Sequence, residues 1–194
     1  GGTSGRTTLI GEGLQHEDGH SHILASTIPN CLAYDPSFAY EVAVIMQNGL
    51  KRMVQDQENV FYYITLLNEN YAMPGLQAGT EEQIIKGMYL LSEPQPSAQG
   101  LQVNLLGCGS ILRESIAAQK LLQEDWGVSA NVWSCPSFNE LAREGQDCER
   151  WNLLHPTATP RVSFVAQQLG KYVGAVVAST DYMKAYAEQI RPFL

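Results

Sequence analysis

The chain has 194 residues, of which 44% are hydrophobic and 16% charged, and its 20 acidic against 12 basic residues give a net charge of −8. This composition is typical of a globular protein with one large or two small domains, and it excludes disordered, collagen-like and disulfide-scaffold classes. An acidic surface argues against broad binding to a phosphate backbone, so we expect no nucleic-acid partner. The lack of any run of about 18 apolar residues excludes a membrane span.

The two ends and the cysteines indicate what kind of protein the sequence comes from. The chain starts Gly1-Gly2-Thr3-Ser4, with no initiator methionine and no apolar signal segment, and it ends within a helical pattern. We therefore expect a fragment of a longer protein. The four cysteines are far apart and form no C-x-x-C pair, which favours reduced thiols and a cytoplasmic location over a disulfide framework.

The first half of the chain is expected to alternate strands with helices after a loop-like start over residues 1–22. Asp35-Pro36 predicts a helix start, because an acidic cap is followed by proline at the first helical position. The nearly unbroken apolar run over residues 60–67 predicts a strand that is covered on both faces. The predicted elements are a strand at 28–34, a helix from Asp35 to about residue 55, a strand at 60–67 and a short helix at 81–86.

Two prolines and small polar side chains at residues 94–100 predict an extended linker between two segments, residues 1–93 and residues 101–194. After this linker the alternation resumes, which favours parallel strands joined by crossovers and hence an α/β fold with helices on both faces of open sheets. The predicted elements are strands at 101–106, 128–133 and 172–178 and helices at 110–125, 138–143, 161–169 and 182–190. The helix at 110–125 is expected to bury Ile111, Leu112, Ile116, Leu121 and Leu122.

A glycine-containing turn, Gly107-Cys108-Gly109-Ser110, follows a predicted strand and opens a predicted helix, which is where α/β proteins bind phosphate. The full G-x-G-x-x-G pattern is absent because Leu112 stands at the third glycine position. A plain turn capped by Ser110 is therefore the favoured interpretation. No histidine lies nearby to act as a base for Cys108, which favours a packing role over a nucleophilic one.

The densest polar cluster spans residues 11–22 and contains His16, His20 and His22 together with three carboxylates. The H-x-x-x-H-x-H spacing with flanking acids is an acceptable ligand set for a divalent cation. A second interpretation is an active-site loop in which one histidine and one glutamate transfer protons on a bound substrate. A third is a solvated polar loop, and the residues alone leave all three open.

Two further polar segments are weaker candidates for a functional site. Residues 68–71 follow the C-terminal end of a predicted central strand, where ligands of open α/β sheets bind, so they either border a site or cover the strand end. Residues 145–152 mix charge with one tryptophan and are expected to anchor a connection.

Several of these motifs resemble one enzyme family. The segment GRTTLIGEGLQHEDGHS at residues 5–21 is similar to the homodimeric type of pyruvate dehydrogenase, the thiamine-diphosphate-dependent decarboxylase component of the bacterial pyruvate dehydrogenase complex. The resemblance covers essentially the whole chain. It continues through YDP at 34–36, YEVAVIM at 40–46, YYIT at 62–65, NENY at 68–71, GQDCERWN at 145–152 and ASTDYMK at 178–184.

The resemblance implies a transketolase-like fold with three α/β domains per subunit and a cofactor held between the subunits of a homodimer. Residues 1–93 would then be the later part of the middle, pyrimidine-binding domain, and residues 101–194 the first part of the C-terminal domain. The implied cofactors are thiamine diphosphate and Mg²⁺, and their main ligands are expected upstream of this sequence.

The implied activity is the oxidative decarboxylation of pyruvate, followed by transfer of the acetyl group to a lipoyl group of the dihydrolipoyl acetyltransferase core. His16 matches a family active-site histidine that lines the pyruvate pocket, and Glu12 in the same motif is the second candidate catalytic residue. His20 and His22 are then expected to support the loop or to face solvent, and to tolerate substitution. The alternative function is a non-catalytic metal-binding or protein-interaction module built on residues 16–22.

Overall fold

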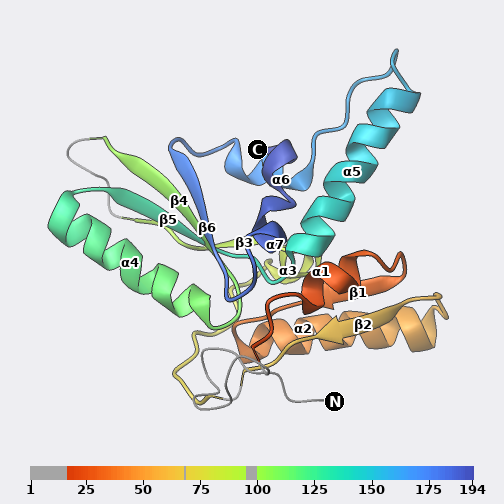
Figure 1. The fold of residues 1–194 in the computed structure, drawn as a ribbon, viewed down its shortest axis with the longest axis horizontal. Coiled ribbons are helices and arrows are strands. Elements are labelled where there is room, and N and C mark those ends of the chain that lie inside the picture. The colour runs from red at the N-terminus through yellow and green to blue at the C-terminus, as the bar shows by residue number, and fades with distance from the viewer. Residues whose placement is uncertain (1–16, 68, 95–99) are drawn as a thin grey trace.

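The computed structural model of the protein describes residues 17–67, 69–94 and 100–194, and Figure 1 shows how the elements are arranged. No helix in these three ranges is both long and apolar enough to cross a membrane. The first half contains α1 (Ser21–Ser26), β1 (Cys31–Tyr34), α2 (Ala39–Leu50), its π-helical continuation η2 (Lys51–Gln55), β2 (Phe61–Ile64), α3 (Glu81–Lys86) and β3 (Tyr89–Ser92). The second half contains β4 (Gln102–Gly107), α4 (Ile111–Trp126), β5 (Ser129–Ser134), α5 (Phe138–Leu154), α6 (Phe164–Leu169), β6 (Ala175–Ser179), α7 (Ala185–Glu188) and the 3-10 turn η3 (Arg191–Phe193).

The first sheet consists of β1 and β2, which run parallel and pair from Cys31 opposite Phe61 to Tyr34 opposite Ile64. All four residues of β1 are buried, because α2 and the second half of the chain cover it. The prediction that β2 is covered on both faces is wrong: its residues are half-buried, and Phe61 is 44% exposed. Within the described ranges β2 pairs only with β1, so its apolar side chains are at a sheet edge.

The second sheet has the strand order β3-β5-β4-β6 (Figure 1). β4 lies parallel to both β5 and β6, and β3 runs antiparallel to β5. Helix α4 covers one face through the core around Leu105 and Val132, while α5, α6 and α7 pack on the other face around Leu106 and Trp133. These mostly parallel, helix-covered sheets confirm the predicted α/β class.

Strand β3 was not expected from the sequence, and it precedes the predicted linker yet belongs to the second sheet. The middle of that linker, residues 95–99, lies outside the described ranges. The division into residues 1–93, 94–100 and 101–194 therefore stays a prediction.

The buried side of α4 differs from the expected one. Leu112 and Ser115 are buried and Leu122 packs against the same core, which gives a sheet-facing stripe at helical spacing. Ile116 and Leu121 lie to the sides of this stripe and are 37% and 56% exposed, so the prediction that they are buried is wrong.

Helix α5 is much longer than the predicted helix at 138–143. It begins behind Ser137, whose side chain accepts a hydrogen bond from the Glu140 backbone N–H at 3.0 Å, and it continues through residues 145–152. From within the helix this stretch anchors the connection to α6, as predicted: the Asn152 side chain hydrogen-bonds the Arg161 backbone at 2.7 and 2.9 Å, and the Arg161 guanidinium lies 4.3 Å from the centre of the Trp151 ring. Gly145 lies within this helix, and the Phe193 ring packs directly against it. An added Cβ at Gly145 would lie 2.5 Å from Phe193 Cδ2, so the contact leaves no room for a side chain.

The carboxyl end of β1 is joined to the second sheet by hydrogen bonds. The Asp35 backbone N–H donates to the Pro136 carbonyl at 2.7 Å, and the Asp35 carbonyl accepts from the Gly109 N–H at 3.1 Å. The Ser137 hydroxyl donates to the Ala33 carbonyl at 2.6 Å. These contacts bring the ends of β1, β4 and β5 into one region, and the candidate site is built there.

Candidate active site

The two predicted catalytic residues, His16 and Glu12, lie outside the described residues, so their roles stay predictions. The description begins at Glu17, and the segment that follows leads into α1. The structure therefore shows how the end of the predicted active-site loop is held, and which side chains surround that end.

Asp18 holds the start of α1. Its Oδ1 accepts hydrogen bonds from the backbone N–H groups of Ser21 at 3.0 Å and His20 at 3.2 Å, and its Oδ2 accepts from the Ser21 hydroxyl at 2.5 Å. Burial opposes ionisation of this carboxyl, but the hydrogen bonds from Ser21 and His20 together hold the pKa of Asp18 below its usual value. An ionised Asp18 thus satisfies backbone donors that would otherwise be open at this helix start.

The histidines of the cluster separate into different environments. His20 is exposed, whereas His22 is fully buried. The His22 Nε2 lies 2.9 Å from the Thr65 Oγ1, and the His22 ring packs against three aromatic rings with centroids 4.8–5.3 Å away. The rings belong to Tyr63, Tyr182 and Tyr186. Of the two expected roles for His22, facing solvent is thereby excluded, and supporting the loop is left.

This separation disfavours the metal-binding interpretation of residues 16–22. His20 and His22 do not converge, since one points outward and the other lies within an aromatic cage. Over the described ranges, no three side chains of His, Cys, Asp or Glu are grouped so that they could hold a metal ion.

Thr65 and Asp35 follow the last residues of β2 and β1, and their side chains meet. The Thr65 hydroxyl donates to Asp35 Oδ1 at 2.6 Å, and the Tyr182 hydroxyl donates to the same oxygen at 3.2 Å. Ligands of α/β proteins bind outside the carboxyl ends of parallel strands, and this cluster lies at such a place. Sequence analysis missed it, because Tyr182 comes from a segment far along the chain.

Asp35 does not have the predicted role of capping the following helix. Helix α2 begins at Ala39, and the side chain of Glu41 caps it by accepting hydrogen bonds from the N–H groups of Ser37 and Phe38. A carboxylate three residues into the helix is the usual partner in a capping box. The Asp35 side chain instead accepts a hydrogen bond from Thr65.

The turn at residues 107–110 does not offer a phosphate site. Gly109 has a φ of +51°, and a Cβ added there would collide with Asp35 Oδ2, so the Asp35 carboxylate packs directly on the turn. The Ser110 hydroxyl donates to Asp181 Oδ2 at 2.7 Å and does not cap α4 as predicted. Two carboxylates beside the turn repel a phosphate group, so the turn does not fit the diphosphate of the implied cofactor.

The cysteines pack as expected. All four are buried and unpaired with one another, and Cys108 belongs to the core of the second half. Burial raises the pKa of Cys148 to about 11 and that of Cys135 well above its usual value. A thiol that stays protonated is a poor nucleophile, which agrees with a packing role.

The loop after β2 covers the strand end. The Tyr71 hydroxyl donates to the Ser37 carbonyl, and the Arg113 guanidinium lies 4.5 Å from the centre of the Tyr71 ring. Arg113 also pairs with Glu69 at 3.0 Å. The loop is therefore packed against the start of α4; Asn68, which was grouped with it, lies outside the described residues.

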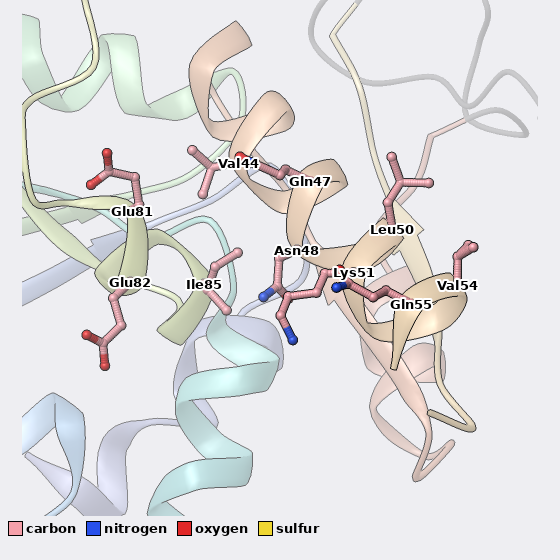
Figure 2. A pocket seen from close by; sticks show the side chains of 10 residues that line it. All are labelled: Val44, Gln47, Asn48, Leu50, Lys51, Val54, Gln55, Glu81, Glu82 and Ile85. Carbon is pink, nitrogen blue, oxygen red and sulfur yellow. The ribbon is translucent and has the colours of Figure 1, made fainter. Parts of the chain in front are cut away.

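A groove of 670 Å³ lies elsewhere, between α2 with η2 and α3 (Figure 2). Its apolar lining comes from Val44, Leu50, Val54 and Ile85. One of its charged side chains, Lys51, forms an ion pair with Asp56, the residue that follows η2. The groove contains none of the predicted site residues and no pairing of a nucleophile with a base, so we assign it no chemistry.

Comparison with known proteins gives consistent results for both halves of the chain. Residues 1–74 match the sequence model of the pyruvate dehydrogenase E1 component middle domain, and residues 87–193 match that of the transketolase-like C-terminal domain. The whole chain is 60% identical to the pyruvate dehydrogenase E1 components of Cupriavidus necator, Pseudomonas aeruginosa and Escherichia coli K12. It spans 22% of the length of each of these relatives.

Solved transketolases from Pichia stipitis share the fold. A structure in complex with sedoheptulose 7-phosphate aligns over 92% of this chain and 25% of its own, with a TM-score of 0.51 and 18% identity. A second, in complex with xylulose 5-phosphate, aligns over the same shares with a TM-score of 0.52 and 19% identity. At this level of identity the likeness concerns the fold alone.

Proposed function

Because the chain belongs to the transketolase-like family of pyruvate dehydrogenase E1 components, we propose that it is part of an enzyme that decarboxylates pyruvate oxidatively. In the proposed reaction the acetyl group passes to a lipoyl group on the dihydrolipoyl acetyltransferase core of a multienzyme complex. The observation that carries this proposal is the 60% identity that extends over all 194 residues. A homodimer in the cytoplasm is part of the same proposal.

His16 is the proposed catalytic residue, and Glu12 is the second candidate. An imidazole beside a 2-oxo acid donates hydrogen bonds to the carboxylate, and it stabilises negative charge as that charge develops. Support comes from the segment after His16, because Asp18 and α1 are held beside the carboxyl ends of β1 and β2. That is the edge of the sheet at which α/β proteins bind their ligands.

Thiamine diphosphate and Mg²⁺ belong to the proposal, but the described residues do not fit either group. The turn at residues 107–110 faces the carboxylates of Asp35 and Asp181, and the described ranges contain no cluster of metal-ligating side chains. We therefore propose that both cofactors are bound mainly by residues other than the described ones, and that this chain contributes the loop that carries His16.

The test uses the full-length protein that contains this sequence. With thiamine diphosphate, Mg²⁺ and pyruvate, we expect release of carbon dioxide, and with a lipoyl-domain acceptor we expect acetylated lipoyl groups. Omission of thiamine diphosphate is the matched control, and 2-oxobutanoate tests the choice of substrate. Absence of pyruvate-dependent carbon dioxide from correctly folded, cofactor-loaded protein would overturn the proposal.

A further inference from the structure

Four side chains form a continuous hydrogen-bonded network at the carboxyl ends of β1 and β2; we call His22, Thr65, Asp35 and Tyr182 the His22 network. His22, Asp35 and Tyr182 are buried, and Thr65 is half-buried. His22 Nε2 lies 2.9 Å from Thr65 Oγ1, Thr65 Oγ1 lies 2.6 Å from Asp35 Oδ1, and the Tyr182 hydroxyl lies 3.2 Å from that same oxygen. The network joins α1 to the ends of both strands and to the segment before α7. It therefore fixes α1 to three separate parts of the chain.

The chemistry of the network fixes the direction of its hydrogen bonds. The Thr65 hydroxyl donates its proton to Asp35 Oδ1, and the Tyr182 hydroxyl also lies 3.3 Å from Thr65 Oγ1. Because the Thr65 proton is used toward Asp35, we assign His22 the tautomer that carries its proton on Nε2 and donates to Thr65. The hydrogen bond from His22 to Thr65 requires an N–H at Nε2, and a neutral imidazole can provide it.

His22 holds α1 but does not reach a substrate. Its side chain is fully buried, and the rings of Tyr63, Tyr182 and Tyr186 pack around it. A side chain with no exposed surface acts on a reaction only through the residues that it positions. His22 is thus a positioning residue in this structure.

The segment that His22 holds is the one that leads back to His16. Helix α1 starts one residue before His22, and Asp18 binds the backbone at its start. The Gly19 carbonyl also accepts from the Met183 N–H at 3.1 Å, which ties the same segment to residues beside Tyr182. His16 precedes Asp18 by only two residues in the sequence, and this nearness along the chain is what relates the network to it.

We propose that His22, through Thr65 and Asp35, positions the active-site loop so that His16 is correctly oriented, an inference that rests on the proposed function of His16. Misplacement of a catalytic group by about 1 Å lowers turnover by up to about a hundredfold without removing any group from the site. Loss of the network therefore affects the rate of the chemical step more than the binding of pyruvate or of the cofactor.

The first experiment compares substitutions in the full-length, cofactor-loaded protein. His22→Leu removes the donor at similar volume, and we expect kcat to fall about 10–100-fold while KM for pyruvate changes by less than about threefold. His22→Gln places an amide N–H near the Nε2 position and is expected to restore most of kcat. His20→Leu is the matched control, since His20 is exposed in the same segment, and its kcat should stay at the wild-type value. An equal loss in His22→Gln and His22→Leu would overturn the proposal.

A double-mutant cycle separates positioning from general destabilisation. If His22 acts through His16, then His22→Leu causes little further loss of kcat in a protein that already carries His16→Ala. Multiplication of the two losses would overturn the proposed coupling. Should His22→Leu fold poorly, Thr65→Val against Thr65→Ser provides a second pair, because only serine keeps the hydroxyl that joins His22 to Asp35.

Hydrogen–deuterium exchange adds a readout that does not depend on activity. We expect His22→Leu to raise exchange over residues 10–21 and to leave α2 and the second sheet unchanged. Unchanged exchange over residues 10–21 would overturn the positioning role. If His16→Ala alone keeps wild-type turnover, the proposed role of His16 fails, and the exchange result still shows whether His22 holds the segment.

Discussion

Glu41 is a fully buried carboxylate that joins α2 to the second sheet. Its Oε2 accepts from the backbone N–H groups of Ser37 and Phe38, and its Oε1 accepts from the hydroxyls of Tyr89 at 2.7 Å and Ser134 at 2.5 Å. Burial raises the pKa of Glu41 above its usual 4.5, although these hydrogen bonds act in the opposite direction. The side chain thus satisfies donors from both halves of the chain, and its ionisation disfavours the folded state.

The sign of the resulting pH dependence follows from this raised pKa. Because the folded protein holds the Glu41 proton more tightly than the unfolded chain, the contribution of Glu41 to stability is complete below about pH 4.5 and is lost as the pH rises through the folded-state pKa. Glu41→Gln cannot ionise. We therefore expect its stability relative to wild type to improve as the pH rises, by about 1.4 kcal/mol for each unit by which the pKa is raised.

Urea unfolding of both proteins at several pH values measures this difference in the free energy of unfolding. Glu124→Gln, on the exposed face of α4, is the matched control and should show no such trend. A difference between wild type and Glu41→Gln that is constant with pH contradicts the prediction.

His16 carries the prediction about the reaction. In the full-length protein, His16→Ala should lower turnover by about 10²–10³-fold, the usual cost of removing one hydrogen-bond donor aimed at developing charge. The affinity for thiamine diphosphate should stay nearly unchanged, because His16 is proposed to face the substrate. Steady-state kinetics and calorimetric titration of the cofactor measure the two quantities, and a variant that fails mainly in cofactor binding would assign His16 to another role.

At the scale of single residues, the sequence identifies types of side chain better than their surroundings. Local composition singled out the glycine-rich segment before α1 as a candidate site, and the roles of His16 and Glu12 within it stay predictions. The burial of His22 was missed, because its cage is formed by Tyr63, Tyr182 and Tyr186, which are distant in the sequence. Asp35 was misassigned for a related reason: its partner Thr65 is brought to it only by the pairing of β1 with β2.

The helices and strands themselves were predicted well where apolar periodicity is local. The short helix α3 has the predicted bounds, and α2 with η2 ends at the predicted residue. Strand β3 was missed because four residues carry little pattern, and its antiparallel pairing with β5 depends on residues 40–45 positions further along the chain. The length of α5 was underestimated because glycine disfavours a helix interior. In the structure Gly145 lies inside the helix and allows the close approach of the Phe193 ring.

That contact gives a prediction for α5. Replacing glycine with alanine in a helix interior normally stabilises by up to about 1 kcal/mol. At Gly145 the new Cβ would lie 2.5 Å from the Phe193 ring, and such overpacking costs typically about 1–3 kcal/mol. We therefore expect Gly145→Ala to lower the melting temperature.

The controls use a second helical glycine and a smaller partner. At Gly49 in α2 an added Cβ would lie 3.3 Å from the Tyr62 ring, so Gly49→Ala should lose less stability than Gly145→Ala. Phe193→Leu combined with Gly145→Ala should recover part of the loss. Equal melting temperatures for Gly145→Ala and wild type would contradict the prediction.

On the scale of the whole molecule, the described part of this chain does not contain the cofactor ligands that the proposed reaction needs. Its described residues provide no metal-ligating cluster, and the turn at residues 107–110 excludes a diphosphate. We expect that the isolated 194-residue chain neither binds thiamine diphosphate measurably nor releases carbon dioxide from pyruvate. Isothermal titration with cofactor and Mg²⁺, followed by a carbon dioxide assay, measures both, with the full-length protein as positive control. Saturable micromolar binding would show that the cofactor ligands lie within residues 1–194.

The hydrogen bonds between the end of β1 and the second sheet also have a consequence for the order of folding. A two-stranded sheet such as β1 with β2 is at best marginally stable in water by itself. Its docking partners arrive late, since Ala33 bonds to Ser137, 104 residues further along the chain. During synthesis β1 therefore emerges from the ribosome before Ser137, and its contacts with the second sheet have to wait for that part of the chain. Closing so long a loop costs entropy, so we expect these contacts to form after the more local pairing of β4 with β5.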